Sequence, residues 1–216
     1  MRRVLYIALA VILCSFYALA QDYPKAEVYG GFSLLHLDTE GAKVPAGAPA
    51  GTSIKNWYPG WEAAGQYNLT KMLGVKADFS GEYGKPVSVP GVTVPSLRFY
   101  TFLAGPVITF RGDRFSPFVH AGFGVNHLSL TSYPGGLKFE GVTVPNTGYS
   151  ENAFAMAYGG GLDVKLTHHF AWRLGQFDYV YTKHCLATDG TCNLGVDSAP
   201  AAHQNNFHFS TGVVIH

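Results

Sequence analysis

Two His-x-Ser pairs in the chain could each supply the base and the nucleophile of a hydrolytic site. They are His127-Leu128-Ser129 and His208-Phe209-Ser210. In a serine hydrolase, a histidine takes the hydroxyl proton while the serine oxygen attacks an ester, and a third group orients the histidine. The chain has nine histidines and many serines, so such pairs are expected by chance. We therefore interpret both pairs as hydrogen-bonding residues and predict that the protein is not an enzyme.

Cys185 and Cys192 are the second candidate group, in the polar stretch CLATDGTC. In an exported protein, two cysteines this close in sequence favour a disulfide. His184 precedes Cys185 and suggests a metal site as the alternative, but two cysteines and one histidine are an incomplete ligand set. We predict a disulfide and no metal or cofactor.

The N-terminus predicts export. A short basic region is followed by an apolar run over residues 4–19, and Ala18-Leu19-Ala20 supplies the small residues of a cleavage site. This run is shorter than the roughly 20 residues that a membrane-spanning helix needs. We predict a signal peptide over residues 1–20, cleavage between Ala20 and Gln21, and one domain over residues 21–216.

Strand-like alternation is the main pattern of that domain. From Leu73 to Tyr83 the chain reads LGVKADFSGEY, so one face of the strand is apolar and the other is charged. Most of the predicted strands have about the length that a tilted strand needs to cross a bilayer. The eight predicted ranges are residues 26–37, 60–69, 73–83, 97–110, 117–128, 153–166, 170–182 and 206–215.

The connections between these strands alternate in length. Residues 70–72, 111–114 and 167–169 are short links, whereas 38–59, 84–96, 129–152 and 183–205 are long and rich in Gly, Pro and polar residues. This rhythm predicts an all-β fold, an eight-stranded antiparallel up-and-down transmembrane β-barrel with its long loops at one end. Arg173 breaks the phase of Gln176 and Asp178, so we expect a β-bulge near Gly175.

Composition indicates which face of the sheet is outside. Charged residues are only 13% of the chain and aromatic residues 14%, which is too little charge to coat a soluble protein of this size. We therefore predict an apolar outer face and an interior plugged by ion pairs, since buried charges must be paired. The predicted interior network consists of Glu62, Lys76, Asp78, Glu82, Arg98, Asp163, Lys165, Arg173 and Asp178.

Several stretches across the mature chain resemble the OmpA-like outer-membrane β-barrel superfamily. They include AEVYGGFSLL, LGVKADFSGEYG, FSPFVHAGFGVNHL, AYGGGLDVKL and NNFHFSTGVVIH. The resemblance implies a stand-alone barrel in the outer membrane of Gram-negative bacteria, in contact with lipid and lipopolysaccharide and inserted by the barrel-assembly machinery. The chain departs from the family in ending with His216, where an aromatic residue is usual.

The predicted function is a structural or adhesion-like role in the outer membrane, with a possible extracellular partner for the long loops. The near-neutral net charge of +1 gives no reason to expect a nucleic-acid partner. Three alternatives remain open from the sequence: an outer-membrane enzyme that modifies lipid A, a narrow channel, and a soluble periplasmic barrel that binds a ligand.

Overall fold

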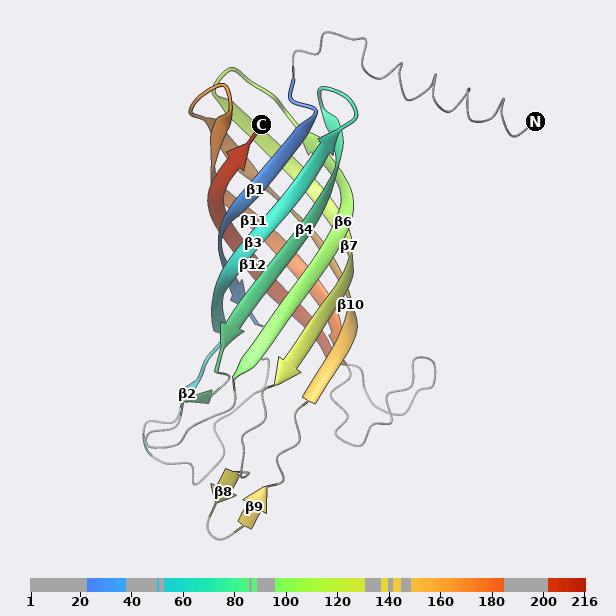
Figure 1. Cartoon of the computed structure of the whole chain (residues 1–216). Coiled ribbons are helices and arrows are strands. Elements are labelled where there is room, and N and C mark those ends of the chain that lie inside the picture. The colour runs from blue at the N-terminus through green and yellow to red at the C-terminus, as the bar shows by residue number, and fades with distance from the viewer. Residues whose placement is uncertain are drawn as a thin grey trace, which may run out of the picture.

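The structure is a closed antiparallel β-barrel of eight long strands (Figure 1). This computed structural model describes residues 23–37, 50, 53–85, 87–88, 96–130, 137–139, 142–144, 149–184 and 202–216. The predicted cleavage site at Ala20 and Gln21 and the predicted disulfide of Cys185 and Cys192 lie outside these residues. The barrel strands are β1 (Ala26–His36), β3 (Trp57–Asn68), β4 (Leu73–Gly84), β6 (Leu97–Thr109), β7 (Phe115–Leu130), β10 (Tyr149–Lys165), β11 (Phe170–His184) and β12 (Ala202–Ile215).

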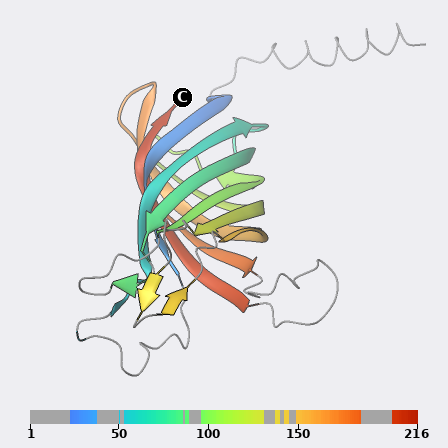
Figure 2. The ribbon, with the colours of Figure 1, turned by 60° about the horizontal axis from the view of Figure 1, so that its bottom comes forward.

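The topology is up-and-down. Each barrel strand pairs with its neighbours along the chain, and β1 pairs with both β3 and β12 to close the ring. The strands are strongly tilted as they wrap around the barrel (Figure 2). Four short strands pair outside the ring, β2 (Ser53–Ile54) with β5 (Val87–Ser88) and β8 (Leu137–Phe139) with β9 (Val142–Val144). They lie in the long connections at the lower end in Figure 1, so the predicted fold class is confirmed.

The alternating side chains of β4 show which face of the sheet lies on the outside of the barrel. Val75 and Phe79 are 48% and 42% exposed on the outer face, whereas Lys76 between them is only 2% exposed and points inward. The same inversion holds around the ring, where most of the exposed large side chains are apolar. An apolar exterior around a polar interior is suited to lipid and not to water. No helix among the described residues is long and apolar enough to cross a membrane.

Two of the short turns are built in the same way. The amides of Leu73 and Phe170 donate to the hydroxyls of Thr70 and Thr167, at 2.9 and 3.1 Å. In return, the amides of these threonines donate to the carbonyls of Leu73 and Phe170. A threonine hydroxyl can satisfy a turn amide in this way, which explains why similar Leu-Thr pairs open both turns.

The bulge expected near Gly175 is present in β11. The register shifts between Arg173 and Gln176 on both sides of this strand. Leu174 and Gly175 lie between them, and this stretch contains one residue more than the paired strands do, which shifts the inward and outward phase by one residue. As a result Arg173, Gln176 and Asp178 all point inward, and each is at most 4% exposed.

Several strands extend further towards the long connections than the sequence predicted. β10 begins at Tyr149 instead of residue 153, and β12 begins at Ala202 instead of residue 206. β7, β10 and β11 contain 16, 17 and 15 residues, against about 9–11 for a strand that only crosses the bilayer. The sequence underestimated them because ladder hydrogen bonds continue where the apolar alternation has ended.

Candidate functional site

The candidate site is a cluster of charged and polar side chains enclosed by the barrel wall. Five carboxylates face two basic side chains and two histidines among the described residues of the middle of the barrel. They come from β3, β4, β7, β10, β11 and β12, so the cluster links strands all around the ring. Its members are Glu62, Lys76, Asp78, Glu82, His120, Asp163, Arg173, Gln176, Asp178 and His208.

Arg173 anchors the end of this cluster nearer the short turns. Its guanidinium forms a two-pronged pair with Asp163, from Nε to Oδ1 at 2.8 Å and from Nη2 to Oδ2 at 3.0 Å. Its third contact is Nη1 to Gln176 Oε1 at 2.7 Å. The same group lies 4.3 Å from the ring centres of both Tyr29 and Phe118. Fork geometry and aromatic stacking are properties of arginine that lysine cannot reproduce.

Lys76 is the second basic residue of the interior. Its Nζ lies 2.7 Å from Asp78 Oδ1 and 3.9 Å from Glu62 Oε1, and it donates to Gln176 Oε1 at 2.9 Å. The Gln176 amide nitrogen in turn donates to Asp178 Oδ2 at 2.6 Å and to Glu62 Oε1 at 3.2 Å. Gln176 therefore joins the Arg173 and Lys76 centres into one network.

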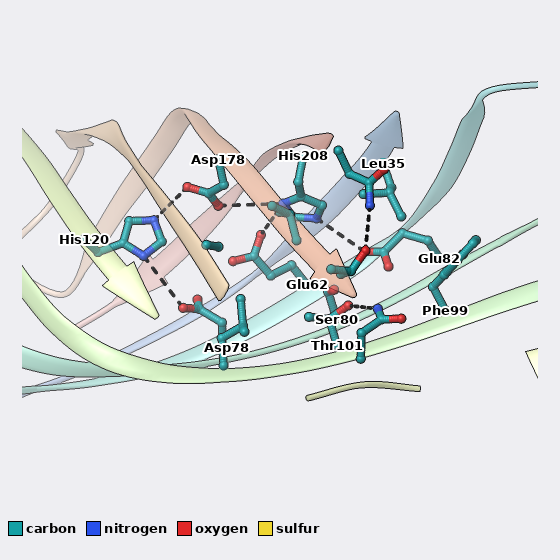
Figure 3. Close-up of a pocket in the computed structure, with 16 residues that line it drawn as sticks. Leu35, Glu62, Asp78, Ser80, Glu82, Phe99, Thr101, His120, Asp178 and His208 are labelled. Atoms are coloured by element: carbon teal, nitrogen blue, oxygen red, sulfur yellow. Dashed lines mark hydrogen bonds and ion pairs between the residues drawn. The ribbon is translucent and has the colours of Figure 1, made fainter. Parts of the chain in front are cut away.

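Two histidines complete the network (Figure 3). His120 lies between Asp178 and Asp78, with its Nε2 2.8 Å from Asp178 Oδ1. His208 Nδ1 lies 3.7 Å from Asp178 Oδ2, and its Nε2 lies 3.3 Å from Glu82 Oε1. The sequence prediction omitted both histidines and Gln176 from the network, because it counted only charged residue types. Strand phase places all three side chains inward, since each is an even number of residues from another inward position on its strand, but the prediction did not add these neutral residues to the network.

The interior is layered along the barrel axis. On the long-connection side of the charged cluster, inward side chains form a buried apolar layer of Leu35, Leu37, Tyr58, Phe99 and Leu128. Towards the short turns, Glu27 pairs with Arg111 and accepts a hydrogen bond from Asn68 Nδ2 at 2.7 Å. The charged cluster thus lies between an apolar layer and a second polar layer.

One glycine makes room for the cluster. A Cβ added to Gly159 on β10 would collide with the Asp178 carboxylate and with the Phe177 carbonyl. Gly159 and Asp178 are directly opposite each other in the ladder between β10 and β11. Only a residue without a side chain lets Asp178 reach His120 and Gln176 across this position.

Two residues predicted for the interior lie elsewhere. Arg98 is exposed on the outward phase of β6, while its neighbour Phe99 points inward. The prediction for Arg98 was wrong because the inner wall is apolar at this end of the barrel. Lys165 shares the phase of Asp163, but it is the last residue of β10 and is exposed, so it does not join the buried network. The other seven predicted residues are brought together.

The two His-x-Ser pairs are separated by the barrel wall. His208 and Ser210 are buried in the interior, at 6% and 0% exposed, whereas His127 and Ser129 are on the outward phase of β7. Within the described part of the chain, no three His, Cys, Asp or Glu side chains are arranged to hold a metal ion. The interior cluster can hold charges in fixed positions, and its basic groups are already engaged by carboxylates.

Comparisons with known proteins agree with this architecture. The family model of the outer membrane protein beta-barrel domain matches residues 6–213. The structure of Neisserial surface protein A (NspA) is similar in fold, with 11% identity, a TM-score of 0.54, and coverage of 89% of this chain and 97% of that one.

Two further structures match with lower TM-scores. Ail of Yersinia pestis has 14% identity, a TM-score of 0.48 and coverage of 88% and 97%. The N-terminal β-barrel domain of OprF from Pseudomonas aeruginosa has 12% identity, a TM-score of 0.45 and coverage of 88% and 96%. No curated protein sequence matches the chain. From the family model and the closed eight-stranded barrel, the chain belongs to the outer membrane protein beta-barrel domain family and lies in the outer membrane.

Proposed function

We propose that this barrel stabilises the outer membrane and presents its long connections to partners outside the cell, without conducting solutes. The observation that carries the proposal is the contrast between the two ends of the barrel. Apolar side chains remain exposed down to the short turns, as at Leu69 and Leu166. At the other end the outward residues become polar, as at Ser150 and Asn152, while the strands continue. The excess strand length therefore projects from the lipid on the side of the long connections.

The interior network supports the absence of conduction. An eight-stranded barrel is just wide enough for its side chains to fill it. In this barrel the interior is occupied by the paired side chains of Arg173 and Lys76 and by the apolar layer that contains Tyr58 and Phe99. Insertion would use the barrel-assembly machinery, as for other proteins of this fold class.

Planar-bilayer recording tests the closed interior. We expect the purified protein to give no unitary current steps. The double variant Tyr58→Ala, Phe99→Ala removes two large side chains from the apolar layer. It is the matched control, because its interior is partly open. Discrete steps from the unmodified protein would contradict a plugged barrel.

Surface labelling and attachment test the role of the long connections. An epitope placed between Leu130 and Tyr149 should be stained by antibody on intact cells, and the same epitope between Thr167 and His169 should not. Replacing the chain between Leu130 and Tyr149 by a short turn should reduce attachment of the cells to immobilised extracellular-matrix proteins. If the unmodified protein and the shortened variant both migrate as folded barrels on gels and the cells that carry them attach equally, the surface-interaction role is rejected.

A further inference from the structure

A group of polar side chains interrupts the apolar outer face near the long-connection end of β6, β7 and β10. Phe102, Val125 and Phe154 lie side by side on these strands and are each about half exposed. Two residues further towards the long connections, the ladder aligns Tyr100, His127 and Asn152 on the same outward face. The next outward row contains Arg98, Ser129 and Ser150.

Three of these side chains are joined by hydrogen bonds. His127 Nδ1 lies 2.7 Å from Asn152 Oδ1, and His127 Nε2 lies 3.2 Å from Ser150 Oγ. An amide oxygen can only accept, so the hydrogen of the imidazole is on Nδ1. Nε2 then has the free lone pair and faces a serine hydroxyl. This is the order of nucleophile, base and orienting group by which serine hydrolase sites are recognised, whatever their position in the sequence.

The depth of the group indicates what it could act on. His127 and Asn152 lie in the first outward row beyond the apolar belt that ends with Val125 and Phe154, and Ser150 lies in the second row. Where an apolar belt gives way to polar residues, the outer wall of a barrel passes from lipid to water. The ester bonds of membrane lipids lie at this boundary, between the acyl chains and the headgroups. Arg98, exposed in the outer polar row, places a positive charge beside this boundary. Such a charge suits an anionic headgroup.

We propose that Ser150, His127 and Asn152 form an ester-hydrolysing site for the acyl chains of membrane lipids. Ser150 Oγ attacks the ester carbonyl carbon while His127 Nε2 takes the hydroxyl proton. The C–O bond to the lipid alcohol then breaks, and the imidazolium returns the proton to the leaving oxygen. Water hydrolyses the acyl-serine by the same route, which releases the fatty acid and restores the serine. This activity adds an enzymatic function to the structural one proposed above, and it stands against the sequence-based prediction that the protein is not an enzyme.

The experiment measures fatty acid release by the full barrel reconstituted in vesicles. One arm contains phosphatidylethanolamine and phosphatidylglycerol, and the other contains purified lipopolysaccharide, which carries esters of the same chemistry. Release from either arm supports the site and identifies the source of the ester. If neither arm releases fatty acid, the proposal is overturned.

Four variants test the roles of the residues. Ser150→Ala and His127→Gln should each lower the rate roughly a thousandfold. Asn152→Ala should lower it about tenfold or more, whereas Asn152→Asp, which keeps the acceptor oxygen, should restore activity. The matched control is Ser129→Ala, because Ser129 is opposite Ser150 in the ladder and has the same side chain.

A covalent probe provides an independent readout that requires no variant to fold. A fluorophosphonate should modify Ser150 in the unmodified protein, as located by mass spectrometry of its peptides. Modification of Ser129 instead, or full activity in a folded Ser150→Ala protein, would overturn the assignment of the nucleophile. Migration on unheated gels identifies the variants that are folded.

Discussion

Replacing Arg173 by methionine is the sharpest test of the interior network. The change removes two hydrogen bonds to Asp163 and one to Gln176, at 2.7–3.0 Å. It keeps an unbranched side chain between the rings of Tyr29 and Phe118. Asp163 is only 6% exposed, so the variant leaves an unpaired carboxylate in the interior. Breaking a buried pair in this way costs about 3–5 kcal/mol, and we expect the free energy of unfolding to fall by that amount.

The measurement is reversible denaturant unfolding of the barrel in phospholipid vesicles, followed by the folded and unfolded bands on unheated gels. Asp163→Asn combined with Arg173→Met removes both charges, and a coupling energy of about 2 kcal/mol or more should appear between the two changes. Lys165→Met is the control, since it removes an exposed basic residue from the same face of β10 and should change stability by at most about 0.5 kcal/mol. A loss below about 1 kcal/mol for Arg173→Met, or strictly additive effects, would refute a network stabilised by this pair.

Two further predictions concern the wall of the barrel. Ala77→Arg places a charge on the outward face of β4, in the middle of the apolar belt, and should destabilise the barrel folded in vesicles by about 2–4 kcal/mol. Its control is Leu166→Arg at the short-turn end, which should cost about 0–1 kcal/mol. Equal losses of unfolding free energy for the two variants in the same unfolding titration would contradict this position of the apolar belt. Gly159→Ala should destabilise the barrel by about 1–3 kcal/mol because the added methyl displaces Asp178. Gly30→Ala, where a Cβ meets no atom within 4 Å, is its control, and equal unfolding midpoints for the two variants would contradict the close packing.

The fold could be predicted from the sequence because its two signals are local. Alternation in segments such as Leu73 to Tyr83 gave the strands, and the rhythm of short and long connections gave the order of pairing. The phase break between Arg173 and Gln176 even located the bulge, since a pleated strand cannot otherwise turn both side chains inward. Strand ends were less predictable, because backbone pairing continues into segments with no apolar face.

The interior could be predicted only in part. Its carboxylates and bases were recognised by charge, whereas Gln176, His120 and His208 are neutral residues, for which strand phase gives an inward position but no partner. Their role depends on partners from strands far apart in the sequence, such as Lys76 and Gln176, which are 100 residues apart. Alternation gives the face of a residue but not its neighbours across the lumen.

Arg98 shows that the direction in which a charged side chain points depends on its position along the barrel axis. In the apolar belt a charged residue must point inward, where Lys76 meets Asp78 and Glu62. Beyond the belt the outward face meets water and headgroups, while Phe99 and Tyr58 close the inward face, so a charged residue there points outward. β7 contains both situations in one strand, because His120 and His127 are seven residues apart and this odd step places them on opposite faces. His120 therefore binds the interior carboxylates, whereas His127 points outward beside Ser150 and Asn152.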